Sequence, residues 1–116
     1  MLFRFGSGNI ESRVSRLIRH IVMWKLKESA EGATREQNAQ TMRALLENCR
    51  DVAAGTREFE VGIAAPGEES TYDVVLVSTF DDAAALNAYQ VHPEHDKATA
   101  FIGKVRETRQ CVDYIF

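Results

Sequence analysis

Two histidines and a tyrosine lie close together in the segment YQVHPEH, which runs from Tyr89 to His95. An imidazole that titrates near neutral pH can take a proton from a carbon beside a carbonyl group, and a tyrosine hydroxyl can hold the resulting oxyanion. The segment therefore contains the groups that enolate chemistry requires. It also suits a joint between two helices, because Pro93 fits the first turn of a helix and not its interior.

A third histidine, His20, lies in the segment RHIVMWKLK, residues 19–27. On a strand it shares one face with three apolar residues, Val22, Trp24 and Leu26. If that face is turned toward the helices, His20, Tyr89 and His95 line one pocket between sheet and helices. These are the candidate catalytic residues, with His95 as general base, Tyr89 as the group that orients the substrate or its oxyanion, and His20 as support.

Each of these residues also has a purely structural interpretation. His92 precedes Pro93 and is expected to cap the second helix, so we interpret this pair as a structural joint. His95 points either into the pocket or along the helix surface. His20 is equally compatible with a hydrogen-bonded core histidine, and Tyr89 with a packing residue whose hydroxyl has a partner.

A metal site is the weaker interpretation of the same segment. His92 and His95 are three residues apart, with Glu94 and Asp96 beside them, but Pro93 disturbs the helical face that they would share. The two cysteines, Cys49 and Cys111, form no CxxC pair and are expected to be buried free thiols. We therefore predict neither a metal nor a cofactor.

The elements that must position these residues follow one another in the order βαββαβ. A capping box at Thr34 and Gln37 begins a helix that ends before Gly55, and two further helical segments meet at the joint. The predicted strands are residues 19–27, 57–65, 72–80 and 106–116. This order predicts a ferredoxin-like α+β plait, with a four-stranded antiparallel sheet and the helices on one face.

The chain divides into an N-terminal appendage, residues 1–18, and a domain, residues 19–116. Glycine, serine and asparagine at residues 6–9 interrupt any regular pattern in the appendage. It is expected to be flexible or docked as a short amphipathic turn, although a transit peptide or a start codon placed too far upstream would also explain it.

Composition limits the classes of function. The 116 residues are 45% hydrophobic and 27% charged, which is typical of one globular domain, and the formal net charge is -3. No basic face is available for nucleic acid, and no run of 18 apolar residues is available to cross a membrane. We predict a cytoplasmic protein that binds neither.

The first and third strands are apolar on both faces, although the helices can cover only one. Ile21 and Met23 oppose the core face of the first strand, and Val75 and Val77 oppose that of the third. Soluble monomers rarely leave such a patch in water. The sequence therefore predicts a homodimer that packs sheet against sheet, with residues 1–18 folded over the sheet as the alternative.

Several of these segments together resemble the stress-responsive dimeric α/β-barrel (Dabb) family: HIVMWKLK, FEVG, YDVVLVSTF, AYQVHPEH and the closing CVDY. The resemblance covers residues 19–114. It implies a ferredoxin-like protomer whose sheet pairs with that of a partner to form a dimeric α/β barrel. Many members have no assigned reaction, whereas a plant cyclase of the family closes a linear polyketide by aldol condensation.

The resemblance to that cyclase assigns substrate contacts to Tyr89, His95 and His20, while Val74 replaces a second strand histidine. The main interpretation is a stress-responsive dimer with a small apolar pocket for an unassigned ligand. The alternative is an acid–base cyclase or lyase acting on a polyketide-like or β-keto molecule, and a haem-degrading monooxygenase has only the fold in its favour. Convergence of the three residues on one cavity favours the enzyme, whereas a cavity filled by Trp24 and Phe101 favours a binding or structural role.

Overall fold

The computed structural model describes residues 16–116, so most of the predicted appendage lies outside the described residues. Four strands form one antiparallel sheet in the order β4-β5-β1-β6. Their bounds are Ile18–Leu26 for β1, Thr56–Ile63 for β4, Val74–Phe80 for β5 and Arg106–Ile115 for β6. The predicted ferredoxin-like α+β fold is confirmed.

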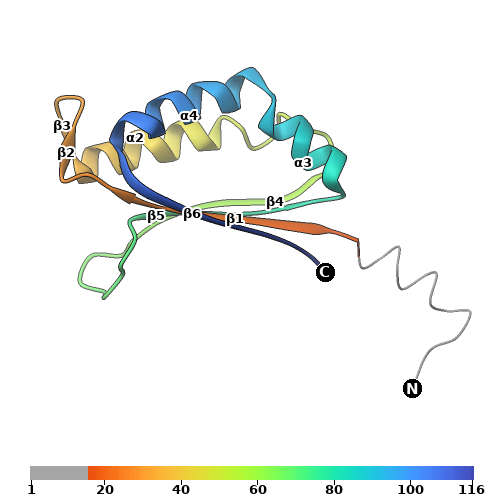
Figure 1. Cartoon of the computed structure of the whole chain (residues 1–116), viewed down its shortest axis with the longest axis horizontal. Coiled ribbons are helices and arrows are strands. Elements are labelled where there is room, and N and C mark those ends of the chain that lie inside the picture. The colour runs from red at the N-terminus through yellow and green to blue at the C-terminus, as the bar shows by residue number, and fades with distance from the viewer. Residues whose placement is uncertain (1–15) are drawn as a thin grey trace, which may run out of the picture.

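Within residues 16–116, three helices cover one face of this sheet, and none covers the other face (Figure 1). They are α2 (Arg35–Glu47), α3 (Ala83–Gln90) and α4 (Pro93–Val105). A short hairpin of β2 (Ser29–Ala30) and β3 (Ala33–Thr34), which the sequence pattern did not predict, connects β1 to α2. Strand β1 begins at Ile18, one residue earlier than expected.

The capping box predicted for α2 is present. The Thr34 hydroxyl accepts a hydrogen bond from the Gln37 amide at 3.2 Å, and the Gln37 side chain accepts one from the Thr34 amide at 2.9 Å. These two bonds satisfy amide groups that the first helical turn leaves without partners. The local sequence thus fixes the first residue of α2.

The segment that joins α3 to α4 sets the positions of two candidate site residues. Helix α3 ends at Gln90, and Pro93 is the first residue of α4. His92 stands between them as the helix cap, because its Nδ1 accepts a hydrogen bond from the Glu94 amide at 3.1 Å. The turn places Tyr89 in the last turn of α3 and His95 in the first turn of α4.

The hydrophobic core fills the space between the helices and the sheet. Strands β1 and β5 contribute alternate buried residues, and α2 and α4 contribute one face each. The most deeply buried side chains include Val22, Leu26, Leu76, Phe80, Met42 and Val105. This side of the sheet is the one on which His20 lies, as the alternation in the first strand predicts.

The opposite face of the sheet carries apolar side chains that no described element covers. Ile21 of β1 lies between Val77 of β5 and Val112 of β6 in the strand register. Met23 is 39% exposed and Val112 is 53% exposed. We refer to the patch formed by Ile21, Met23, Val75, Val77 and Val112 as the outer face.

Strand β6 is an edge strand, and all of its residues are exposed in the single chain. The prediction that Cys111 is buried is therefore wrong, whereas Cys49, at the end of α2, is buried as expected. The helices do not extend far enough across the sheet to cover its last strand.

Candidate functional site

A cavity of about 310 Å³ lies between the helices and the sheet, and the three candidate residues His20, Tyr89 and His95 all line it. Its floor is apolar and is formed by Val22, Trp24, Leu46, Leu76 and Ile102. Trp24 forms part of this lining and does not fill the cavity. The volume is near the lower end of the range for small-molecule pockets.

Tyr89 stands at the centre of this arrangement. Its ring centroid lies 4.8 Å from that of His95 and 6.2 Å from that of His20, both in edge-on geometry. The ring also packs against Phe59 at 5.8 Å and Phe80 at 5.3 Å, and the residue is only 1% exposed. Aromatic contacts on several sides hold the ring in one position.

The Tyr89 hydroxyl makes no hydrogen bond to any other group within residues 16–116. Burial raises the pKa of this phenol well above its ordinary value, and the neighbouring Cys49 raises it further. The hydroxyl therefore stays protonated throughout the neutral range. It can donate a hydrogen bond to a ligand in the cavity, but it cannot act as a base there.

His95 is partly buried, and its imidazole has no hydrogen-bond partner in the described part of the chain. Burial lowers its pKa, and the electrostatic effects of His20 and Arg109 lower it further, while Asp96 raises it. The ring is thus neutral at pH 7. A neutral imidazole carries one nitrogen lone pair that can accept a proton.

His20 is 2% exposed and is held on two sides. Its Nδ1 atom lies 2.5 Å from Oδ1 of Asp113, which is its partner in the β1–β6 register. The Ser78 hydroxyl donates a hydrogen bond to the His20 carbonyl at 2.9 Å. A carboxylate on Nδ1 keeps the proton there, which leaves Nε2 as the acceptor of the neutral ring.

Asp113 was not among the residues singled out from the sequence. The signal that would have found it is the pairing register: the first and last strands are antiparallel neighbours, and Asp113 lies opposite His20. Strand periodicity alone gives the face of each residue, but not which residues pair across strands. The register therefore had to come from the structure.

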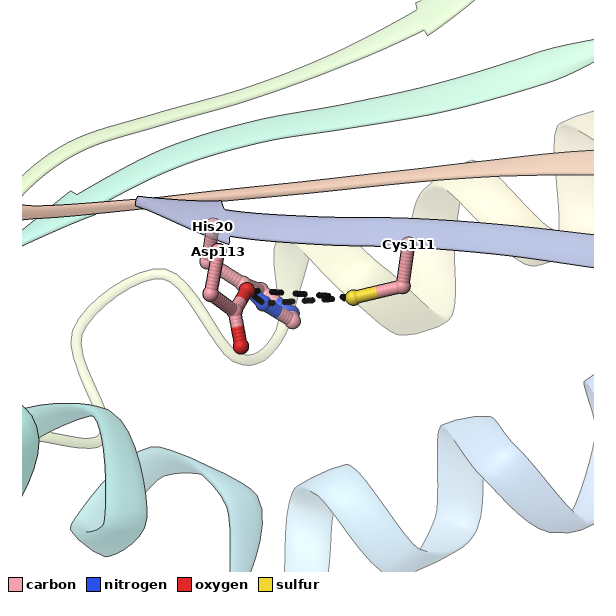
Figure 2. A group of neighbouring side chains, drawn as sticks. All are labelled: His20, Cys111 and Asp113. Atoms are coloured by element: carbon pink, nitrogen blue, oxygen red, sulfur yellow. Dashed lines mark hydrogen bonds and ion pairs between the residues drawn. The ribbon is translucent and has the colours of Figure 1, made fainter. Parts of the chain in front are cut away.

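Figure 2 shows that Cys111 points into the same group as His20 and Asp113. Its Sγ atom lies 3.9 Å from His20 Nδ1 and 3.7 Å from Asp113 Oδ1. Ligand atoms of a tetrahedral metal with bonds of about 2 Å are roughly 3.3 Å apart, so the contact of 2.5 Å between imidazole and carboxylate is a hydrogen bond. Burial and the Asp113 charge also raise the pKa of the Cys111 thiol, which disfavours the thiolate that binds metals.

The opening of the cavity is lined by polar side chains from α3, α4 and β6. Gln90, Thr99, Arg106 and Arg109 all line it and are all exposed. The sequence pattern predicts no role for any of them, because each is an ordinary surface residue in its own element. Only the fold brings them to the edge of one cavity.

The fold and this cavity define a ferredoxin-like α+β protein with a pocket between its sheet and its helices. The model of the Dabb family, described as the stress responsive A/B barrel domain, matches residues 18–116. The chain therefore belongs to the Dabb family, in agreement with the resemblance seen in its motifs. Its reaction is not assigned by this membership.

Solved structures support the same fold. A dimeric ferredoxin-like protein of unknown function from Bacteroides fragilis is 32% identical, with a TM-score of 0.67 over 86% of this chain and 96% of that chain. A dimeric ferredoxin-like protein of unknown function from Thermobifida fusca is 22% identical, with a TM-score of 0.73 over 86% and 91%. A hydroxynitrile lyase from Passiflora edulis is 19% identical, with a TM-score of 0.69 over 88% and 94%.

The comparison with curated proteins found no match. Among the helices of residues 16–116, none has the length and apolar character needed to cross a membrane.

Proposed function

We propose that the cavity is an acid–base site that acts on a small carbonyl compound with an acidic C–H bond, such as a β-keto compound. The observation that carries this proposal is that His20, Tyr89 and His95, from three different elements, line one cavity. A cavity filled by Trp24 and Phe101 would have favoured a structural role. The space instead stays open beside all three side chains.

The proposed chemistry begins with a proton transfer. A nitrogen of neutral His95 takes the proton from the carbon beside the carbonyl. The electron pair of that C–H bond forms the C=C bond of the enolate, and the π electron pair of the carbonyl moves to its oxygen. The Tyr89 hydroxyl donates a hydrogen bond to the oxyanion that forms, and its raised pKa keeps the donor protonated. The enolate can then react in a cyclase or lyase step.

His20 supports this site in our proposal, and Asp113 orients His20. The carboxylate holds the proton on Nδ1, so that Nε2 presents a lone pair to the cavity. Orientation of an imidazole by a carboxylate on its far nitrogen is a recurring device in acid–base enzymes. The hydroxynitrile lyase that shares the fold is an enzyme, but at 19% identity the likeness extends only to the architecture.

We also propose that the functional unit is a homodimer in which the outer faces of two sheets pack together. The uncovered apolar patch supports this arrangement, since a patch of this kind needs a partner in water. The related proteins from Bacteroides fragilis and Thermobifida fusca are dimeric. The predicted cytoplasmic location and the predicted appendage, residues 1–18, stay predictions.

The test is hydrogen–deuterium exchange at C2 of a neutral β-keto amide, 3-oxohexanamide, followed by proton NMR in D₂O. The protein is expected to accelerate exchange above the rate in buffer, with saturation as the amide concentration rises. A rate equal to that in buffer would contradict the acid–base proposal. The pocket would then be a binding site without this chemistry.

A further inference from the structure

The charge distribution of the cavity differs from that of the whole chain. The protein has a formal net charge of -3, yet among residues 16–116 no aspartate or glutamate lines the cavity, and two arginines do. These are Arg106, which follows α4 as the first residue of β6, and Arg109, also on β6. The opening of the cavity is therefore positively charged in a protein that is acidic overall.

Of the arginines in residues 16–116, three pair with an acidic residue, and Arg106 and Arg109 are among those that do not. Arg19 pairs with Glu58 at 3.1 Å, Arg50 pairs with Glu47 at 2.6 Å, and Arg57 pairs with Asp81. Within residues 16–116, neither Arg106 nor Arg109 forms an ion pair with a carboxylate. Their guanidinium groups are thus available to an anion from outside the chain.

The strand register explains how both arginines reach one opening. Arg109 lies opposite Trp24, and Arg106 lies opposite Leu26 beyond an irregularity in the pairing of β1 with β6. Trp24 and Leu26 are buried on the helix side, so their partners on β6 lie on the same side of the sheet. The charge of Arg109 acts on both His95 and Tyr89, since it lowers the pKa of each.

We propose that Arg106 and Arg109 bind the carboxylate of the substrate, so that the site takes a small oxo acid. The planar guanidinium group binds carboxylates through paired hydrogen bonds, and Thr99 and Gln90 offer further polar groups at the same opening. The apolar floor contacts the carbon chain. The ketone end lies toward Tyr89 and His95, an orientation that rests on the proposed acid–base function.

The test compares two ligands of nearly equal size, 3-oxohexanoate and 3-oxohexanamide, by titration calorimetry with the full chain. The acid is expected to bind at least tenfold more tightly than the amide. Arg106→Gln and Arg109→Gln are each expected to weaken binding of the acid about tenfold, or about 1.4 kcal/mol, and to leave binding of the amide unchanged. Arg57→Gln, which removes the same charge outside the cavity, is the matched control and is expected to change neither.

Equal affinities for acid and amide, or equal weakening by Arg57→Gln, would overturn the carboxylate site. Tighter binding of hexyl phosphate than of 3-oxohexanoate would overturn its assignment to a carboxylate, because the arginines would then form a phosphate site. Calorimetry needs no turnover, so selective binding of the acid without C2 exchange would support the anion site while contradicting the proposed reaction. Exchange at C2 of the amide without tighter binding of the acid would support the proposed reaction and contradict the anion site.

Discussion

His20 and Asp113 lie opposite one another on neighbouring antiparallel strands, and their side chains meet with 2.5 Å between Nδ1 and Oδ1. One residue is almost completely buried and the other lies on an exposed edge strand. The contact therefore joins the interior of the cavity to strand β6. It also fixes which nitrogen of His20 is available to a ligand.

Asp113→Asn is expected to lower the C2 exchange rate about tenfold, because His20 loses the charge that holds its proton on Nδ1. Nitrogen-15 NMR of the His20 ring checks the cause directly. The native ring should show protonated Nδ1 and bare Nε2, whereas the variant should show a mixture of tautomers. Asp51→Asn, at an exposed site outside the cavity, is the control and should change neither the His20 tautomer nor the exchange rate. If Asp113→Asn also leaves both unaltered, the proposed role of Asp113 is contradicted.

The pH dependence of exchange should reflect His95. Burial lowers the pKa of this imidazole from its ordinary value of 6.5, so the neutral base persists into more acidic solution than for a free histidine. The rate is expected to fall with acid only below pH 6.5. A midpoint at or above 6.5 in the rate profile would argue against His95 as the base.

The same shift has a consequence for stability. Because the folded state binds its His95 proton more weakly than the unfolded chain does, protonation favours unfolding. The stabilising contribution is fully present above pH 6.5 and is lost as the pH falls through the lowered pKa. Urea unfolding of the native protein and of His95→Gln measures this. The free energy of unfolding should fall less with acid in the variant than in the native protein, and parallel pH profiles of the two would contradict this.

The outer face is expected to hold the dimer together. Val112→Asp places a charge within this patch, on the edge strand β6, and should shift the protein from dimer to monomer, as measured by light scattering at micromolar concentration. Val91→Asp is the matched control, since Val91 is 64% exposed beside the helices and lies outside the outer face. A monomeric native protein, or dissociation by both substitutions, would contradict the proposed interface.

The cap at His92 should matter for stability and not directly for chemistry. His92→Ala removes the acceptor for the Glu94 amide and is expected to cost about 1 kcal/mol in the free energy of unfolding. His92→Asn restores a side chain that caps well and should recover most of that loss. Denaturant unfolding measures both, and equal losses in the two variants would show that the cap bond is not the cause.

Much of the fold could be predicted because local signals agreed with one another. Thr34 and Gln37 mark a helix start, Pro93 marks another, and alternation in β1 places His20 on the core side. Each of these follows from backbone hydrogen bonding or strand periodicity within a few residues. The family model also matches the chain over residues 18–116, which contain all of these elements.

Other features of the site depend on pairing over long distances. The partnership of Asp113 with His20 joins residues 93 positions apart, and the place of Arg109 at the cavity depends on the same register. The exposure of Cys111 depends on how far the helices extend across the sheet. A local sequence pattern determines neither the pairing register of the strands nor the part of the sheet that the helices cover, so these features could be identified only in the structure.

The central claim is that His95 takes a proton from the substrate in the cavity while the Tyr89 hydroxyl donates a hydrogen bond to the oxyanion that forms. The most direct measurement is the C2 exchange rate of 3-oxohexanamide with native protein, His95→Gln and Tyr89→Phe, each shown to keep its native mass and circular dichroism. We expect each substitution to lower the catalysed rate about 100-fold, through loss of the base in one and of the oxyanion donor in the other. Native rates in both folded variants would contradict the account.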